Sequence, residues 1–412
     1  MAREDHTPQP AGRARTRRRK PSLPLLIAAP AAMAVGAGLL VAAQTAPGDE
    51  PELTASSPGT AECGSGEYVA EVEGDDDIGW TVLASGEVVH EGTALLEAMQ
   101  AAVDSLDPAR TAQQGVVVNG SGRVPADASL DLPSHTLFEV CGSLDVAGEA
   151  GDSHAPVRIR QAVDVEVPHL AVTGAPYFGV FVQSSEDVRF GQIDLDLSGG
   201  LGMRIDSRDD DDTRGARDIS IDDVNVTGAS SHAVETYGVN GFTLGTLTAT
   251  DVGGSGLLLN DSENADIGVI DAENVAAGSG YAAFRMANRN GLVNGEYRDT
   301  VHVGQVTARG GGRGIFCVSE SGGATIDRVD IAGTGNDSIL IENCHNVTVA
   351  AEAGTVEGPG GIRLAAREEF ANNSDITLSN LTVIDSEVRE DPCGENTVVE
   401  NVELDNSADR TC

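Results

Sequence analysis

The chain of 412 residues carries 65 acidic and 26 basic residues, which gives a formal net charge of −39. A surface of this charge repels phosphate, so we expect no nucleic-acid partner. A polyanionic polysaccharide would also be repelled unless Ca²⁺ or a local arginine pocket compensated the field. Lys20 is the only lysine, and aromatic residues make up 3% of the chain, so long sugar-stacking platforms are not expected.

The N-terminal 61 residues predict an export signal followed by a linker. Residues 1–22 are basic, and residues 23–43 hold an uncharged apolar run from Leu25 to Ala43, as in a signal peptide or signal anchor. Small residues at the end of the run suit cleavage, whereas an uncleaved 25–43 segment could just span a bilayer as a membrane anchor. In both cases the basic flank stays in the cytoplasm and the rest of the chain is secreted or displayed on the cell surface. The composition of residues 44–61 predicts a flexible linker.

Residues 62–150 are predicted to form an N-terminal region that contains one short helix. The segment 93–106 has apolar residues at helical spacing. It precedes alternating apolar runs that begin at Gly115 and Leu130 and are typical of strands.

The next part of the chain repeats one pattern eight times. A small residue precedes an alternating apolar run, a polar turn and a second apolar stretch, and the repeats start at Gly179, Gly202, His232, Gly256, Tyr281, Gly314, Ser338 and Gly361. A period in the twenties predicts a solenoid, and the alternation predicts strands that stack on their neighbours. We therefore expect an all-β fold, a parallel β-helix over residues 151–390 with roughly 4.8 Å between coils, followed by a C-terminal cap at 391–412.

Aligning the repeats at their starting residues predicts two rows of inward-facing side chains. The first row is Val180, Met203, Ala233, Leu257, Ala282, Ile315, Ile339 and Ile362. The second row is Val182, Ile205, Glu235, Leu259, Phe284, Cys317, Ile341 and Leu364. Glu235 is the one charged residue in these rows, and a local change of register would instead turn it outward.

These coils resemble the right-handed parallel β-helix superfamily of pectate and pectin lyases and polygalacturonases. The resemblance covers about residues 93–390 and implies that the helix at 93–106 caps the open end of the solenoid. Polygalacturonase motifs are mostly missing, since Asn336-Asp337 keeps only one aspartate of the Gly-Asp-Asp strand and no Gly-His-Gly occurs. The resemblance therefore implies the fold and no particular activity.

Six cysteines are available for disulfides, which an oxidising compartment favours. Fifteen connectivities are possible for six cysteines. We predict pairing between sequence neighbours, namely Cys63–Cys141, Cys317–Cys344 and Cys393–Cys412. No Cys-x-x-Cys spacing is present, so a zinc site is not expected.

Two coils are longer than the others, and both carry their extra residues just after the first strand. One insertion spans residues 207–215 and the other lies near 288–298. Equal positions in a solenoid lie on one edge, so we expect two loops that bracket the coils starting at His232 and Gly256. The bracketing coils should lie about 14 Å apart, three strand spacings. Loop-walled grooves on a rigid scaffold are common functional sites.

The floor of this predicted groove carries the candidate site residues. A carboxylate at the inward position of Glu235 should have a raised pKa, which suits a general acid. The catalytic candidates are Glu235, Asp261, His232 and Arg285, and the substrate-binding candidates are Asp206, Tyr237, Asn260, Tyr281 and Glu342. Asp206, Thr236, Asn260, Arg285 and Glu342 are expected to face outward at the strand ends.

Several of these residues also have a purely structural interpretation. His232 is equally consistent with a turn residue bonded to the backbone, and Arg285 with a solvated salt bridge to Asp261 or Glu263. The run Asp209, Asp210, Asp211 and Asp212 predicts either a Ca²⁺ site, which would be the one cofactor, or a solvated charge run.

These features are compatible with three functions. The first hypothesis is an extracellular polysaccharide hydrolase, with Glu235 and Asp261 as the carboxylate pair and Asp206 as a substitute. The second is a polysaccharide lyase, with Arg285 or His232 as the base and Ca²⁺ as the neutralising group. The third is a non-catalytic glycan-binding or adhesin-like surface solenoid. The acidic surface favours hydrolysis of a neutral or weakly charged glycan, and we expect a monomer.

Overall fold

The computed structural model describes residues 62–208 and 215–412. The predicted export signal at 23–43, the linker at 44–61 and Asp209 to Asp212 lie outside the described residues. Among the residues that are described, no helix is long and apolar enough to cross a bilayer.

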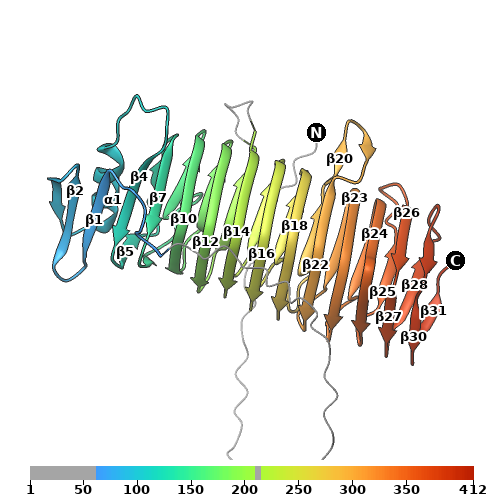
Figure 1. Cartoon of the computed structure of the whole chain (residues 1–412). Helices are drawn as coiled ribbons and strands as arrows, with labels where there is room; N and C mark the ends of the chain where they lie inside the picture. Colours follow the sequence, from blue (N-terminus) through green and yellow to red (C-terminus); the bar gives the residue numbers. More distant parts are fainter. Residues whose placement is uncertain (1–61, 209–214) are drawn as a thin grey trace, which may run out of the picture. The chain divides into compact units, whose positions relative to one another are not determined.

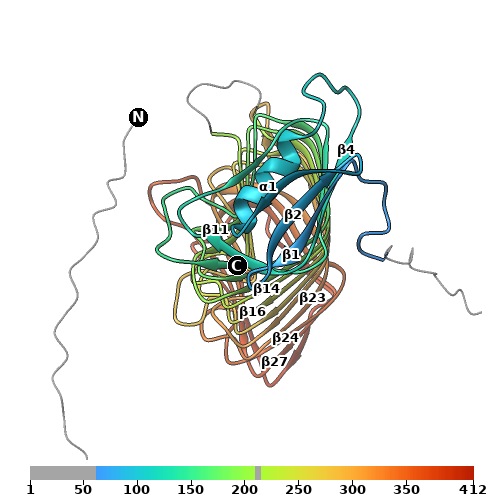
Figure 2. The same ribbon diagram turned by 90° about the vertical axis from the view of Figure 1, so that its left-hand side faces the viewer.

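A helix and a small antiparallel sheet close the N-terminal end of the described unit. Helix α1 (Leu95–Asp104) lies across this end (Figures 1 and 2) and buries one face that includes Leu95, Met99 and Val103. The antiparallel strands are β1 (Ala70–Asp75), β2 (Gly79–Ala84) and β3 (Glu87–Gly92), and β1 also pairs in parallel with β4 (Gln114–Asn119). The capping helix predicted from the sequence is confirmed, and it covers the core that the first coil would otherwise expose.

The rest of the unit is a parallel β-solenoid of about 13 turns, as predicted. One column, here called the short-strand sheet, consists of β6 (Leu130–Leu132), β9 (Val157–Arg160), β11 (Phe178–Gln183), β13 (Leu201–Asp206), β15 (Val234–Tyr237), β17 (Leu257–Asn260), β19 (Phe284–Ala287), the starts of β23 (Ile315–Ala332) and β24 (Ile339–Glu357), β25 (Ile362–Ala365), β28 (Glu387–Asp391) and β31 (Ala408–Arg410).

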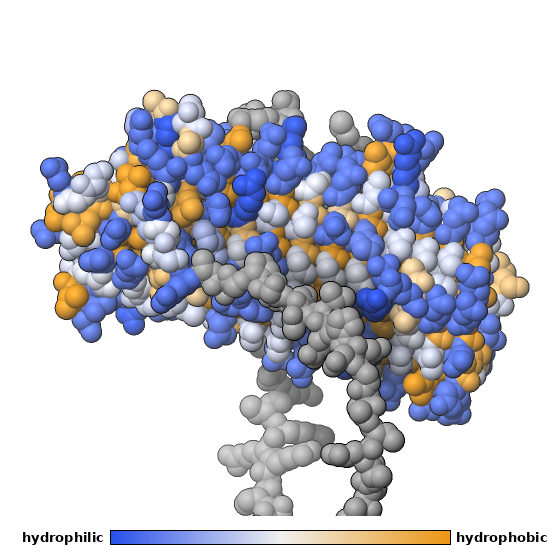
Figure 3. Space-filling view, in the orientation of Figure 1, coloured by the Kyte–Doolittle hydropathy of each residue, from blue (hydrophilic) through white to orange (hydrophobic). Residues whose placement is uncertain are grey.

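The remaining strands of the solenoid, several of which are longer, form the other faces of the coil. They are β5 (Gly122–Pro125), β7 (Thr136–Val140), β8 (Leu144–Ala147), β10 (Val163–Gly174), β12 (Glu186–Leu197), β14 (Arg217–Thr227), β16 (Asn240–Thr250), β18 (Glu263–Glu273), β22 (Val301–Arg309), the later parts of β23 and β24, β26 (Ser374–Ser379), β27 (Leu381–Ile384), β29 (Val398–Glu400) and β30 (Glu403–Asp405). Figure 1 shows these strands side by side, and Figure 3 shows that hydrophilic side chains cover most of the face they present.

The register of the short-strand sheet differs from the predicted one in two coils. Met203 pairs with Val234 rather than Ala233, and Leu257 pairs with Phe284 rather than Ala282. Glu235 therefore faces outward, so its predicted inward position is wrong and the alternative of a register change is confirmed. Thr236 faces inward in its place and is fully buried, so the expectation that Thr236 faces outward is also wrong. Its Oγ1 lies 3.0 Å from the Oγ of Ser262.

The physical reason for the difference is the cost of burying a charge. A slip of one residue moves every side chain of a strand to the other face. An unpaired carboxylate in the core costs several kcal/mol, on the order of the solvation it loses, whereas a threonine hydroxyl needs only one hydrogen-bond partner.

The three disulfides are the three predicted pairs. Cys63–Cys141 joins the segment before β1 to the first coils, and Cys393–Cys412 joins the loop after β28 to the last residue of the chain, two positions beyond β31. Cys317–Cys344 links adjacent coils at fully buried positions. No cysteine among the described residues is free.

The observed register predicts which phenylalanine supports the core. Phe284 is fully buried in the interior row, so Phe284→Ala should lower the free energy of unfolding by about 3–5 kcal/mol. Phe370→Ala, in the half-buried loop after β25, should cost less than about 1 kcal/mol. Urea unfolding followed by circular dichroism measures both, and equal losses would show that Phe284 lies outside the core.

Candidate functional site

The outer face of the short-strand sheet brings six side chains from six successive coils into one row. The pairing register places them in the order Phe181, Arg204, Glu235, Leu258, Arg285 and Phe316. Neighbours in such a row are separated by about 4.8 Å, the spacing of paired strands. Residues 23 to 31 positions apart in the sequence thus become lateral neighbours.

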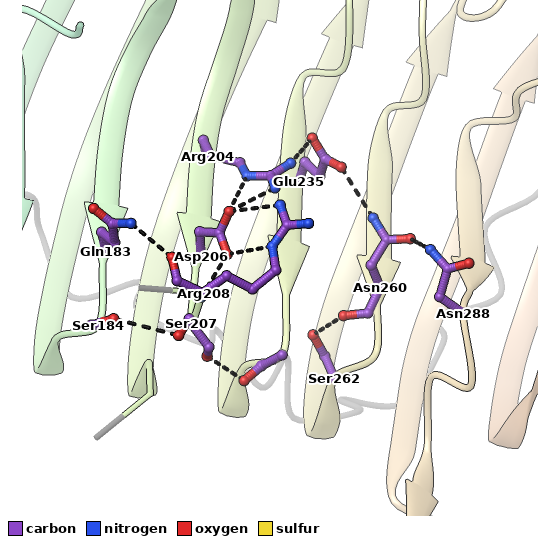
Figure 4. A network of polar contacts seen from close by, with 11 residues as sticks. Gln183, Ser184, Arg204, Asp206, Ser207, Arg208, Glu235, Asn260, Ser262 and Asn288 are labelled. Carbon is purple, nitrogen blue, oxygen red and sulfur yellow. Dashed lines mark hydrogen bonds and ion pairs between the residues drawn. The ribbon is translucent and has the colours of Figure 1, made fainter. Parts of the chain in front are cut away.

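Arg204 connects two carboxylates of adjacent coils (Figure 4). Its Nη1 forms an ion pair with Glu235, and its Nη2 and Nε lie 2.8 and 3.2 Å from Oδ2 of Asp206. All three side chains are only 10–12% exposed. A charge-assisted contact in such a poorly solvated place is stronger than one at the open surface.

Asp206 is held further by Arg208. The backbone N–H and the Nε of Arg208 donate to Oδ1 at 2.8 and 3.0 Å, and its Nη2 donates to Oδ2 at 2.8 Å. Burial alone would raise the pKa of Asp206, but the hydrogen bonds from Arg208 and Arg204 outweigh burial and keep it below its ordinary value. The guanidinium of Arg208 also lies 3.6 Å from the ring centroid of Tyr237.

Two asparagines extend the network toward the C-terminal coils. Asn260 Nδ2 donates to Oε1 of Glu235 at 3.1 Å, and Asn288 Nδ2 donates to Oδ1 of Asn260 at 3.0 Å (Figure 4). Both oxygens of Glu235 therefore accept from a donor on a neighbouring coil. These contacts fix the position of the carboxylate, and each oxygen keeps one further acceptor site.

A cavity of about 700 Å³ lies over β11, β13 and β15, beside this network. One wall contains Tyr177, Phe178 and Phe181, whose rings contact one another in sequence with centroids 4.7 and 4.9 Å apart. The adjoining part of the lining, here called the ionic wall, carries Arg204, Asp206, Arg208 and Glu235, and Arg204 is the strand neighbour of Phe181. The volume is in the range of small-molecule and sugar sites in proteins.

The cavity lies one to two coils closer to the N-terminus than the predicted groove. The aromatic wall was not foreseen, because outward-facing residues do not follow the repeat that reveals the inward ones. The available signal was local: Tyr177, Phe178 and Phe181 are three of the 14 aromatic residues of the chain, and they occur within five positions.

His232 is bonded to the backbone of the next coil. Its Nδ1 accepts from the N–H of Ser255 at 2.7 Å, and its ring meets Tyr281 edge to face at 4.9 Å. The backbone-bonded interpretation of His232 is thus confirmed, and this acceptor role leaves the proton of the neutral ring on Nε2. Burial lowers the pKa of His232, and Arg285 and Arg204 lower it further, against the opposing effect of Glu235.

The remaining predicted residues lie outside the cavity. Asp261 is at an exposed turn with φ 46°, and among the described contacts neither an ion pair nor a hydrogen bond joins it to Glu235 or Arg285. Arg285 instead lies against the rings of Tyr281 and Phe316, at 4.9 and 5.2 Å. Glu342, on β24, pairs with Arg367 at 2.7 Å. The structure thus joins Glu235 to Asp206 rather than to Asp261.

One of the two predicted loops is described in full. Residues 288–298 form a hairpin of β20 (Leu292–Val293) and β21 (Glu296–Tyr297), which rises above the edge of the strands in Figure 1. The other insertion falls largely in residues 209–214 and lies outside the described residues, together with the predicted Ca²⁺ ligands.

The described residues contain one cluster of potential metal ligands. It consists of Cys63, Glu139 and His169. The sulfur of Cys63 is in a disulfide, and Glu139 is bonded to His169, Tyr68 and the N–H of Gly64. These contacts account for the cluster without an ion.

Comparison with known proteins yields a similarity in architecture. No protein-family model matches the sequence, and no curated protein does. Among solved structures, the A-module of the mannuronan C-5 epimerase AlgE6 of Azotobacter vinelandii is similar, with 13% identity and a TM-score of 0.38 over 77% of this chain and 92% of that chain. A likeness at this level does not extend to function.

The lowered pKa of His232 predicts a sign for the pH dependence of stability. The unfolded chain protonates this ring at an ordinary pKa of about 6.5, above the folded value, so the unfolded state binds more protons as the pH falls through 6.5. The stability associated with neutral His232 is therefore complete above pH 6.5 and is lost on acidification. His232→Asn should flatten the fall in melting temperature between pH 7.5 and 5.

His302 provides a control of opposite sign. Asp266 and Asp327 hydrogen-bond to its ring and raise its pKa, so its contribution is complete below pH 6.5 and is lost as the pH rises through the folded pKa. The difference between wild type and His302→Asn should therefore grow on acidification. A His232→Asn variant whose melting temperature follows the wild-type pH profile would contradict the assignment.

Proposed function

We propose that this protein binds a polysaccharide outside the cytoplasm, in the cavity over β11, β13 and β15. The observation that carries the proposal is the presence of an aromatic wall and a fixed ionic wall next to each other in one cavity. A sugar ring has an apolar face of C–H groups, which a flat aromatic ring can cover, and a rim of hydroxyls, which need donors and acceptors. The two walls provide both kinds of contact.

The ionic wall is already ordered before a ligand arrives. Asp206 accepts from Arg204 and Arg208, and Glu235 is held by Arg204 and Asn260. Side chains that are fixed in advance lose little conformational entropy on binding. A site of this kind can select among hydroxyl orientations, because its donors and acceptors cannot follow the ligand.

The disulfides support the proposed location. Three bridges form among the described residues, and such bridges persist in oxidising compartments outside the cytoplasm. This agrees with the export signal predicted for residues 23–43.

Hydrolysis of the bound glycan is the second candidate function. It is favoured by two carboxylates on adjacent strands, Asp206 and Glu235, which line the same cavity. A glycosidase needs one carboxyl as acid and one as base or nucleophile. Here both carboxylates form ion pairs with Arg204, and the lowered pKa of Asp206 disfavours it as the acid. Binding therefore has more support than cleavage.

Binding can be tested with a panel of immobilised neutral and acidic glycans and the whole protein. Tyr177 is 39% exposed, so Tyr177→Ala should leave the fold intact and weaken binding of the preferred glycan by about tenfold, or ~1.4 kcal/mol. Ile78→Ala removes a side chain that is 82% exposed in the N-terminal turn and should bind like wild type. If Tyr177→Ala retained wild-type affinity, the cavity would not be the binding site.

Cleavage can be tested on the same panel by the release of reducing ends. If the second candidate is correct, wild type releases them and Glu235→Gln loses at least about a hundredfold of the rate, the usual effect of removing a positioned acid or base. Glu403→Gln, an exposed position on β30, should remain active. Binding without release of reducing ends by wild type would leave binding as the function.

A further inference from the structure

Two arginines on the outer face of the short-strand sheet flank one aromatic ring. Arg285 of β19 and Arg313, in the loop before β23, lie 5.2 and 4.9 Å from the ring centroid of Phe316. Arg285 also lies 4.9 Å from the ring of Tyr281. This group, here called the arginine pair, is about 10 Å from Glu235 along the sheet, two strand spacings from β15 to β19.

The arginine pair lacks a carboxylate partner. Within the described chain, no Asp or Glu oxygen lies within 4.0 Å of either guanidinium, whereas most other described arginines form such ion pairs, among them Arg123, Arg158, Arg189, Arg204, Arg208, Arg289, Arg309, Arg328, Arg363 and Arg367. In a protein with a net charge of −39, counter-charges for two arginines are abundant in the sequence. The lack of a carboxylate within ion-pair distance of the arginine pair therefore indicates a place left for an external anion.

The carboxylates nearest to the arginine pair are engaged by other guanidinium groups. Glu235 raises the pKa of Arg285 but is bonded to Arg204, and Leu258 lies between Glu235 and Arg285 in the strand pairing. Asp337 and Glu342 face Arg313, but they lie 4.0 Å from Arg363 and 2.7 Å from Arg367. The arginine pair thus forms no direct ion pair, although nearby acidic groups compensate part of its charge.

Burial makes this arrangement costly in the free protein. The Nε atoms of Arg285 and Arg313 are buried without a hydrogen-bond partner among the described residues. Burial lowers the pKa of both groups and outweighs the opposite effect of their acidic neighbours, Glu235 for Arg285 and Asp337 and Glu342 for Arg313. Contact with the aromatic rings of Phe316 and Tyr281 offsets part of the cost. A ligand that brought a negative charge would offset the remainder.

We propose that the arginine pair is an anion-binding site that takes a carboxylate or sulfate group carried by a glycan. The planar guanidinium fork of arginine matches the oxygens of such groups in a bidentate manner. The site extends the proposed function and depends on it only for the polymer that carries the anion. It also provides the local arginine pocket that an acidic glycan needs to overcome the repulsion of the protein's overall field.

The first test uses inorganic sulfate and the double variant Arg285→Gln/Arg313→Gln. A matched control is Arg309→Gln/Arg328→Gln, which removes the same charge from exposed arginines that are paired with Asp330 and Glu352. At equal ionic strength, sulfate in place of chloride should raise the melting temperature of wild type and control more than that of the double variant. An equal rise in all three proteins would be the general effect of sulfate on exposed surface and would overturn the site.

The double variant should fold, because the charges that it removes have no ion-pair partner. Arg313 Nη1 donates to the carbonyl oxygen of Gly280 at 2.8 Å, and glutamine keeps an amide donor for such a bond. If it does not, Arg285→Lys/Arg313→Lys keeps the charges and removes the forks, and it should show a smaller sulfate effect than wild type. A lysine variant with the full wild-type effect would show that no bidentate site exists.

The second test separates the source of the anion and separates this proposal from the proposed function. Wild type and control should bind polygalacturonate, a sulfated polymer such as chondroitin sulfate, or both, at least about tenfold more tightly than the double variant does. Neutral glycans should bind all three proteins equally, and Tyr177→Ala should weaken that binding. If Tyr177→Ala bound neutral glycans as tightly as wild type does, while wild type still bound sulfate, the cavity would be rejected as the glycan site and the arginine pair would stand. Failure of wild type to bind sulfate and both acidic polymers would reject the arginine pair alone.

Discussion

The regular stacking of backbone coils through parallel hydrogen bonds determines everything else in this protein. Strands that pair in register place position after position of one coil directly over the same position of the next. Inside the coil this produces rows of apolar side chains, as in Leu257, Phe284 and Ile315. Outside it produces rows of side chains whose chemistry the core does not constrain, and the candidate site is one such row.

Arg204 illustrates how this constraint creates a site. Its neighbour across the strand pair is Glu235, and two residues further along its own strand lies Asp206. One guanidinium therefore reaches a carboxylate on its own coil and another on the next coil, with no loop needed to bring them together. Arg285 has leucine and phenylalanine as its strand neighbours instead, and its charge stays without a partner. The same stacking geometry produces an ordered ionic wall on β13 and β15 and, on β19, an arginine without an ion-pair partner.

The sequence predicted the parts of the structure that the repeat itself encodes. The period and the alternation were sufficient for the β-solenoid, and the pairing of sequence neighbours gave the three disulfides. The helix followed from its apolar spacing, and its capping position followed from the family resemblance. The register around Glu235 was not predicted correctly. The insertion at 207–215 changes the coil length, so the sequence no longer indicates which residue of the next coil pairs with which residue of the previous one. Alignment on the small residue that begins each coil then placed His232 opposite Gly202, whereas Ala233 occupies that position.

The candidate site was predictable only in part, for a related reason. Asp206, Tyr237 and Asn260 were identified because they follow regular strand ends, and they do lie beside Glu235. Tyr177, Phe178 and Phe181 were missed, because a single aromatic cluster on the outside of one coil leaves no periodic signal. The lack of a partner for Arg285 and Arg313 is a property of three-dimensional neighbours and has no counterpart in the sequence.

The positions of the disulfides have a consequence for how this protein comes apart. A solenoid is held together only by contacts between successive turns, so its terminal turns are the natural place for unravelling to begin. Here Cys63–Cys141 ties down the first turns and Cys393–Cys412 ties down the last. With both ends fastened, loss of structure has to start in the interior, where every turn has two neighbours. Such a molecule should withstand proteases for as long as its surroundings remain oxidising, and it should peel away from its ends once they are reducing.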